Sequence, residues 1–529
     1  MPERIRLTED NRKWWTLAAM CFALFMVMLD NTVVNVALPS IQKDLGASIT
    51  SLEWTVNAYT LTFAVLLVTG GRLGDIFGRR RMFLFGVVLF ALSSAAIGFA
   101  PTDTLLVAGR AIQGIGAAFM MPGTLSIISN TFPPEERGRA IGTWAGVSAL
   151  ALAVGPVVGG ALTEYVSWRA IFFLNLPVAV GAVAVTLFAA RESRDNTIER
   201  KVDIPGIAAL SVSLTALVLA LVEGNGWGWT SGRIIALFTV AAVGFIAFAL
   251  TEMRVRVPMV QFAFFKSRSF VGANVVAFIV SFAMLAMFFF IALYMQNILG
   301  YSPLEAGVRF LPSTAMIIIA APIAGRLSDR IGPKPLIVTG LGLASFALYL
   351  QSTIDVNTGY GHLLPAFIIM GIGMGLTMSP MSTAAMNAVS VDKAGAASGI
   401  LSMSRMVGGT FGVALIGALF ESTSRNRLAD SLGKLSLTPG QRSSITDQIA
   451  TGTGGQPKGV PGAVATQVHA ASNDAFIHAL SSSLTVATFV AAFGAIAAAA
   501  LIERKRPARS REQELRQSPE AVAAEELAA

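Results

Sequence analysis

The sequence predicts an all-α integral membrane protein with fourteen transmembrane helices. Three observations lead to this fold class. Hydrophobic residues make up 54% of the 529 residues and charged residues only 13%, which is too apolar for a soluble protein. Apolar runs of about 20 residues, the length of a membrane-spanning helix, recur along the chain. A glycine-rich segment beginning at Gly71 recurs 254 residues later at Gly325, so one half of the chain repeats the other.

The apolar runs define the expected helices in chain order. They are 14–38, 52–72, 82–100, 104–129, 138–163, 168–190, 204–223, 232–251, 270–298, 304–326, 335–352, 363–388, 395–420 and 476–502. The first run is longer than the apolar part of a signal peptide, so we expect it to be retained. The repeated segment follows the second and the tenth run. Two six-helix halves alone would place the second copy six runs after the first, but the observed shift is eight. The sequence therefore predicts two six-helix halves with the seventh and eighth helices inserted between them.

The expected domains follow from this arrangement. They are a tail at 1–13, a six-helix half at 14–190, a linker with the two inserted helices at 191–251, a second half at 252–502 and a tail at 503–529. Two hydrophilic stretches, 422–473 and the last tail, are rich in small polar or charged residues. Such compositions bury little apolar surface, so we expect both to be flexible or only partly ordered.

The distribution of lysine and arginine predicts the orientation. Basic residues gather in the tails and in the even-numbered connections, as at Arg79, Arg80 and Arg81, whereas most odd-numbered connections, such as 100–103, contain none. Because cytoplasmic loops carry this excess, we expect both termini in the cytoplasm and a multi-pass protein of the cell membrane. The net charge of +8 then reflects topology, and no nucleic-acid partner is expected.

The sequence gives no sign of a cofactor, a metal site or an enzyme. Cys21 is the single cysteine, and His469 and His478 lack a nearby carboxylate cluster, so solvated histidines are the simpler interpretation. No P-loop or complete dinucleotide fingerprint occurs, which argues against ATP hydrolysis. No catalytic constellation is visible either. An ion gradient is therefore the expected energy source.

Ionisable side chains within the apolar runs indicate where protons are coupled. An acid in mid-membrane costs roughly 2.5–3.5 kcal/mol, so Asp30 in the first run is a candidate proton carrier; a purely structural carboxylate is the alternative. Arg110 shares one helical face with Gln113, and its alternative is snorkelling to the interface. Glu223, near the outer end of the seventh run, is either a coupling acid or an ordinary interfacial one.

The repeated segment predicts a conformational latch on the cytoplasmic side. Glycines allow a tight turn, and a carboxylate can accept hydrogen bonds from a helix N-terminus or pair with arginines. The residues concerned are Gly71, Asp75, Gly78, Arg79 and Arg80, with Asp329 in the second copy. A plain positive-inside anchor is the alternative. Pro333 and Lys334 replace arginines in the second copy, which weakens the latch there.

The fifth expected helix combines a bend with small residues. Pro156 removes a backbone hydrogen bond within the apolar run. Gly155, Gly159 and Gly160 surround it and allow a neighbouring helix to come close. We therefore expect a kinked, tightly packed helix.

Together these motifs resemble the major facilitator superfamily, and within it the branch of fourteen-span drug/proton antiporters. Four segments carry the resemblance: Leu29 to Pro39, Gly71 to Arg81, Arg110 to Gly116 and Gly155 to Gly160. The resemblance implies alternating access between the two halves, an antiporter motif at Gly155, Pro156, Gly159 and Gly160, and proton coupling through Asp30 beside the fixed charge of Arg110.

The expected function is export of amphipathic, often cationic, organic compounds in exchange for protons by a monomer. Polar and aromatic side chains near mid-membrane are the candidate substrate contacts, with plain packing as the alternative. They are Asn31, Asn35, Asn57, Tyr59, Gln113, Phe288 and Gln296. An exporter of a lipid, siderophore or endogenous metabolite is the main alternative function. A nutrient symporter fits the fifth-helix motif less well, and a channel would need neither the latch nor the kinked helix.

Overall fold

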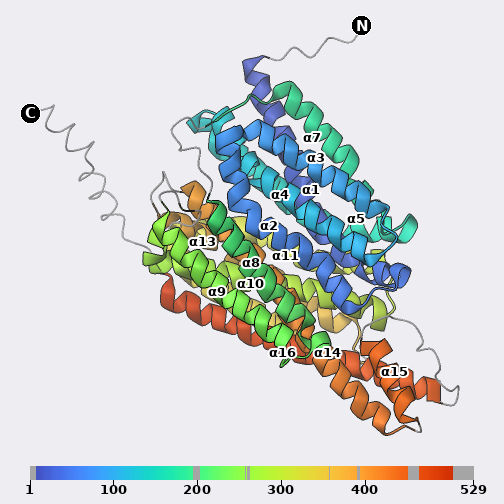
Figure 1. Cartoon of the computed structure of the whole chain (residues 1–529). Coiled ribbons are helices and arrows are strands. Elements are labelled where there is room, and N and C mark those ends of the chain that lie inside the picture. Colours follow the sequence, from blue (N-terminus) through green and yellow to red (C-terminus); the bar gives the residue numbers. More distant parts are fainter. Residues whose placement is uncertain are drawn as a thin grey trace, which may run out of the picture.

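The computed structural model describes residues 8–194, 203–255, 258, 262–356, 358–389, 394–435, 437–450 and 464–503. These residues form helices and connections, with no strand among them (Figure 1). Two segments discussed above lie outside the described residues: the tail at 504–529 and residues 195–202 of the linker. The predicted all-α class is confirmed.

The first half contains the helices expected from the apolar runs. They are α1 (Glu9–Leu45), α2 (Ile49–Phe77), α3 (Arg79–Gly98), α4 (Asp103–Thr131), α5 (Pro134–Tyr165), and the pair α6 (Ala170–Phe173) and α7 (Asn175–Ala189). The inserted pair is α8 (Ile204–Trp227) and α9 (Gly232–Arg254), which pack on each other.

The second half begins with the short helix η1 and repeats the pattern. It comprises η1 (Phe262–Lys266), α10 (Arg268–Leu293) with its π-helical end η2 (Tyr294–Ile298), α11 (Pro303–Ile331), α12 (Pro333–Ser352), α13 (Tyr360–Asn387), α14 (Ala394–Gly433), α15 (Pro439–Ala450) and α16 (Ala465–Leu501). Glycines with φ of +114° at Gly78 and +86° at Gly332 form the turn that precedes α3 and α12, so both copies of the repeated segment use the same left-handed turn.

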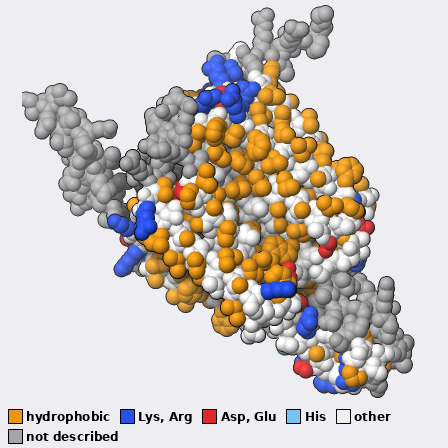
Figure 2. Space-filling view, in the orientation of Figure 1, with side chains coloured by type: hydrophobic (Ala, Val, Ile, Leu, Met, Phe, Trp, Pro, Cys, Tyr) orange, Lys and Arg blue, Asp and Glu red, His pale blue; other side chains and the backbone are white. Residues whose placement is uncertain are grey.

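The number of spans is compatible with the predicted fourteen. Within the described residues, twelve helices are long and apolar enough to cross a membrane, and α2, bent by 49°, makes thirteen. The remaining expected span, 138–163, lies within the 32-residue helix α5. Figure 2 shows hydrophobic side chains over the flank of the bundle, as a bilayer requires, with clusters of Lys and Arg near its top and left edges.

The two halves meet along four pairs of helices. These are α2 with α14, α5 with α11, α1 with α10 and α1 with α11, and we call these contacts the seam. Helix α8 packs on both α2 and α14, so the inserted pair lies beside the seam. We call the end of the bundle where α1 ends and α2 begins the α1–α2 end; the charge distribution predicts that it faces away from the cytoplasm.

Much of the 422–473 stretch, which we expected to be flexible or only partly ordered, is helical in its described residues. Helix α14 continues to Gly433, α15 forms a separate helix, and α16 already begins at Ala465. A small apolar cluster holds them together, formed by Leu428, Leu432, Leu437, Ile445, Val468 and Ala475. The average composition hid leucines at i, i+4 spacing, which make one face of α14 apolar.

Candidate functional site

A buried ion pair joins the first and fourth helices. Arg110 of α4 donates from Nη1 to Asp30 Oδ2 of α1, and each residue is only 1% exposed. Both charges therefore lie in a medium of low dielectric constant, where each depends on the other for its stability. The sequence predicted both residues, and the structure brings them into contact.

Residues from two helices surround the pair with further polar contacts. Gln113 donates to Asp30 Oδ1 at 3.0 Å and accepts from Arg110 Nη1 at 2.6 Å. Arg110 also donates from Nε to the Thr55 carbonyl at 3.0 Å, and its guanidinium lies 4.2 Å from the centre of the Tyr59 ring. Two of the predicted substrate contacts, Tyr59 and Gln113, thus belong to the charged network itself.

The structure adds residues that sequence reasoning missed. Asn175 at the start of α7 donates to Asp30 Oδ1 at 3.3 Å and to Ser94 Oγ at 3.2 Å, while Gln113 donates to Ser94 at 2.7 Å. Asn175 is a lone amide within an apolar run, which is the only sequence signal that could have identified it.

The contacts of Asp30 are those of a carboxylate. Arg110, Gln113 and Asn175 all donate to its two oxygens, and an ionised carboxyl group acts only as an acceptor. The pair and its amide partners thus form one buried polar network that joins α1, α4 and α7.

Of the other predicted substrate contacts, Asn31 lies beside Tyr59 at the edge of this network, whereas the remaining four do not converge on it. Asn31 and Asn35 donate to carbonyls of their own helix, at Val27 (3.0 Å) and Asn31 (2.9 Å). Asn57 is fully buried on α2 with both carboxamide atoms unpartnered.

Two further candidates lie in the second half. Phe288 packs on Phe310 with ring centres 4.9 Å apart. Gln296 donates to the Val36 carbonyl at 2.8 Å, which joins η2 to α1 across the seam. The seven residues therefore do not form a single cluster.

The predicted antiporter motif lies where α5 packs between α1 of its own half and α11 of the second half. A Cβ on Gly155 would overlap Thr32, and one on Gly159 would lie 2.8 Å from the Val33 Cα, so these glycines let α1 approach. On the other side, a Cβ on Gly160 would lie 2.6 Å from the Leu304 Cα of α11. Helix α11 contributes a glycine of its own, since a Cβ on Gly307 would overlap the carbonyl of Pro156.

The repeated segment contacts a residue that was not predicted. Asp75 pairs with Arg79 one turn later at 2.8 Å, as the pattern allowed. The N-terminus of α3 is instead capped by Glu192, which accepts from the backbone of Arg80 at 3.0 Å and of Arg81 at 3.2 Å.

The glycines of this segment serve close packing and the turn. Gly71 lies against Pro122 of α4, and a Cβ on Gly78 would lie 2.6 Å from the Glu192 carboxyl carbon. The side chain of Asp329 lies outside what the structure describes.

Glu223 lies at the seam rather than in open solvent. Its carboxylate accepts a hydrogen bond from Trp54 Nε1 at 3.1 Å, which links α8 to α2.

No group of three or more His, Cys, Asp or Glu suited to a metal occurs within the described residues.

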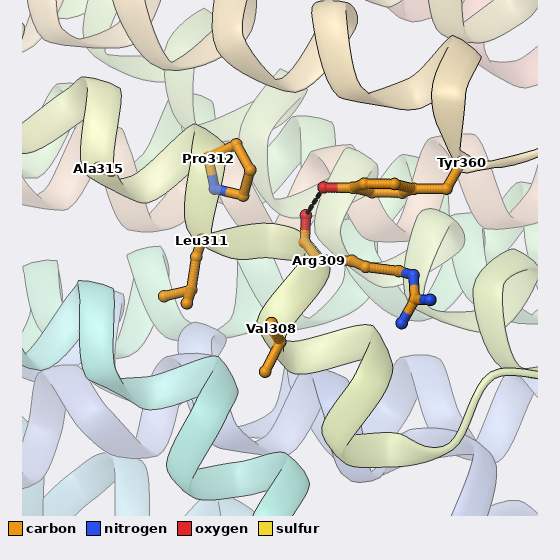
Figure 3. Close-up of a pocket in the computed structure, with 6 residues that line it drawn as sticks. All are labelled: Val308, Arg309, Leu311, Pro312, Ala315 and Tyr360. Atoms are coloured by element: carbon orange, nitrogen blue, oxygen red, sulfur yellow. Dashed lines mark hydrogen bonds between the residues drawn. The ribbon is translucent and has the colours of Figure 1, made fainter.

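A separate surface cavity of about 550 Å³ lies on α11 beside Tyr360 (Figure 3). Tyr360 donates to the Arg309 carbonyl at 2.9 Å, and the Arg309 guanidinium lies 3.7 Å from the centre of the Tyr301 ring. Its other lining residues are apolar. This cavity contains none of the predicted site residues.

Comparison with known proteins places these features in one family. The family model described as Major Facilitator Superfamily matches residues 20–413. The chain is 34% identical to a tetracenomycin C resistance and export protein of Streptomyces glaucescens, over 94% of this chain and 92% of that protein. It is 38% identical to a puromycin resistance protein of Streptomyces alboniger, over 80% and 84% of the two chains. A multidrug resistance protein, Stp, of Mycobacterium tuberculosis is 34% identical over 89% of each chain.

A solved structure shows the same fold at low sequence identity. A bacterial homologue of the human lysosomal transporter Spinster, in an inward-facing and unoccupied conformation, superposes with a TM-score of 0.60. The two chains are 17% identical, and the match covers 94% of this chain and 99% of that one.

Proposed function

Because the chain belongs to the major facilitator superfamily and its relatives include resistance and export proteins, we propose that it exports drug-like organic compounds in exchange for protons. The observation that carries the proton-coupling part is the buried Asp30–Arg110 pair with its amide partners. It is an ionisable site inside the membrane bundle. Charged side chains are costly in a membrane, so those found there usually serve a function such as proton relay.

The proposed cycle uses the seam as a gate. In the present conformation the halves are joined near the α1–α2 end: Gln296 donates to the Val36 carbonyl, and the Leu304 amide donates to Glu164 at 3.0 Å. Opening this seam would expose the substrate path to one side, and closing it would allow access from the other. A proton taken up by Asp30 would disturb its pairing with Arg110 and so favour one of these states.

Several features of the cycle are part of the same proposal. The α1–α2 end faces outward, both termini are cytoplasmic, the protein acts as a monomer in the cell membrane, and it has no enzymatic activity. Arg110 and Glu223 assist coupling, while the Asp75–Arg79 pair and the side chain of Asp329 take part in the cytoplasmic latch. The named relatives, which confer resistance to tetracenomycin C and puromycin, favour drug-like compounds over lipids or siderophores as cargo.

The test is transport by purified protein in liposomes with an imposed pH gradient. We expect uphill movement of ethidium or puromycin by the native chain and loss of uphill movement in Asp30→Asn, with dye binding retained. Asp430→Asn makes the same change at an exposed site and should transport normally. Uphill transport by Asp30→Asn at the native rate would refute coupling through Asp30, and transport insensitive to the gradient would refute antiport altogether.

A further inference from the structure

A second acidic residue is buried in the seam, away from Asp30. Glu53 lies in the second turn of α2, near the α1–α2 end, and is only 3% exposed. Within the described residues its carboxylate has no hydrogen bond and no ion pair. Glu53 lies at the edge of an apolar run, where acids are usually hydrated, so the sequence does not single it out.

The surroundings of Glu53 come from two other helices. Its carboxylate lies directly against Gly417 of α14, where an added Cβ would overlap it. The charged groups that act on Glu53 are Glu421, one turn further along α14, and Glu223 of α8. Glu421 is itself paired with Arg425 at 3.6 Å and accepts from Asn225, and Glu223 accepts from Trp54. Both charged groups that act on Glu53 are therefore acidic, and each already has a partner of its own.

The protein leaves unused hydrogen-bonding capacity beside this acid. Asn57 lies one turn along the same face of α2 and is fully buried, with its carboxamide nitrogen and oxygen both unpartnered. On the next turn, Thr60 accepts a hydrogen bond from Thr410 of α14 at 2.7 Å, so this face of α2 belongs to the seam. Glu53 and Asn57 thus form a polar stripe that is buried where α2 packs on α14.

Charge and burial together determine which form of Glu53 fits the closed seam. An ionised carboxylate without a partner is costly in a medium of low dielectric constant, and neighbouring acids add repulsion. The neutral, protonated acid avoids both costs. Separation of α14 from α2 would bring water to Glu53 and make the ionised form favourable. The closed seam therefore binds a proton at Glu53 more tightly than the open seam does.

We propose that Glu53 is a second proton-binding site, distinct from Asp30, through which acid on the side facing the α1–α2 end closes the seam between α2 and α14. The inference rests on the proposed function, because it assumes that the halves separate at this end. The proton enters and leaves on the same side, so it gates the cycle without being carried across the membrane. By linkage, protons must stabilise whichever state binds them more tightly.

The experiment measures how accessible the seam is as a function of pH. Cys21→Ser removes the single cysteine, and Ala418→Cys then places one thiol in the seam, at a residue only 4% exposed. A membrane-impermeant maleimide is added on the side facing the α1–α2 end. Labelling rates are measured at pH 5.5 and 7.5. Because maleimide reacts with the thiolate, each rate is divided by the rate of a fully exposed cysteine at the same pH. The corrected rate then reports how often the seam opens.

We expect corrected labelling to be about fivefold or more slower at the acidic pH. In Glu53→Gln, which mimics the protonated acid, labelling should be slow at both pH values. Asp430→Asn should behave as the parent does. Asp30→Asn should lose uphill transport but keep the pH dependence of labelling, which separates failure of this proposal from failure of the proposed function.

Three results would overturn the proposal. The pH dependence could be missing in the parent, or it could persist unchanged in Glu53→Gln. Alternatively, Na⁺ or K⁺ at constant pH could slow labelling in a manner that depends on Glu53, which would make this a metal-cation site rather than a proton site. Because glutamine has the size of glutamate and carries no charge, the variant should fold, and its elution on size-exclusion chromatography verifies this.

Discussion

At the scale of single residues, double substitution separates the structural role of the Asp30–Arg110 pair from the coupling role that we propose for it. Removing one partner of a buried ion pair leaves an uncompensated charge and costs about 3–5 kcal/mol. We therefore expect Arg110→Gln to lower the thermal unfolding temperature markedly. Asp30→Asn together with Arg110→Gln should regain most of the lost stability but no uphill transport.

Two measurements check this prediction: thermal unfolding followed by intrinsic fluorescence, and uphill transport in liposomes. Arg309→Gln is a matched control, because Arg309 is partly exposed and lies between two tyrosine rings. If the double variant were no more stable than Arg110→Gln alone, the two charges would not be coupled as the contact indicates.

We expect Asn175 to position the Asp30 carboxylate. It donates to Asp30 and to Ser94, and so holds the carboxylate in place beside Arg110. Asn175→Ala removes this donor, and we expect uphill transport in liposomes to slow while dye binding is retained. Asn274→Ala is the control, because Asn274 is also a buried asparagine but bonds within α10 and to Ser404. Uphill transport at the native rate by Asn175→Ala, with normal protein yield, would contradict this role.

The sequence made Asp30 and Arg110 visible because a charge within an apolar run is costly and therefore conspicuous. Asn175 and Ser94 were not predicted, since uncharged polar side chains are common in membrane helices. The Thr55 carbonyl could not have been predicted, because every residue has one and only the packing of α4 against α2 selects it. Glu53 escaped notice since burial at a helix end depends on which neighbouring helix covers it.

At the scale of helices, the glycines of α5 fix how closely the halves approach. A Cβ on Gly159 would lie 2.8 Å from the Val33 Cα, so Gly159→Ala must push α5 away from α1. We expect a loss of about 1–3 kcal/mol, seen as a lower unfolding temperature, together with slower transport.

Gly146 in the same helix is the matched control. Nothing lies within 4 Å of a Cβ built there, so Gly146→Ala should be neutral or slightly stabilising, as alanine favours helix. Equal effects at the two positions would mean that close packing is not what Gly159 provides.

The N-terminus of α3 offers a second test at this scale. Glu192→Ala removes the carboxylate that accepts from the amides of Arg80 and Arg81, and we expect these two amides to exchange hydrogen faster. Exchange measured by mass spectrometry should show the change in α3 alone. In comparison, Glu305→Ala removes a cap from α11 and should leave α3 unaffected. Unchanged exchange at 80–81 would show that water replaces the cap without cost.

Apolar runs located the helices well but not their ends. Every expected span lies in or overlaps a helix, yet α1 and α14 continue for several residues into polar sequence, because capping and packing outside the membrane extend them. The break between α6 and α7 lies within one apolar run and left no hydropathy signal. Glu192 could not be assigned to α3 from sequence, as the contact depends on how the chain returns after α7.

At the scale of the whole molecule, the internal repeat predicted the two halves and the inserted pair, but not how they meet. The hydropathy pattern is the same whichever end of the seam is closed, so the sequence does not predict which end that is. The contacts between the halves show it, because α2 packs on α14 and α5 packs on α11 near the α1–α2 end. Alternating access then requires this seam to separate once in every cycle.

A reversible cross-link across the seam tests that requirement. Thr60 and Thr410 belong to different halves, and their hydroxyl oxygens lie 2.7 Å apart, so cysteines at both positions in a Cys21→Ser background should form a disulfide on oxidation. We expect oxidation to stop transport, because α2 and α14 can no longer part, and reduction with dithiothreitol to restore it. Each single-cysteine variant, oxidised in the same way, should transport normally, which excludes damage by the oxidant. Continued transport at the native rate by fully cross-linked protein would mean that α2 and α14 stay together throughout the cycle, and the gate would then have to lie elsewhere in the molecule.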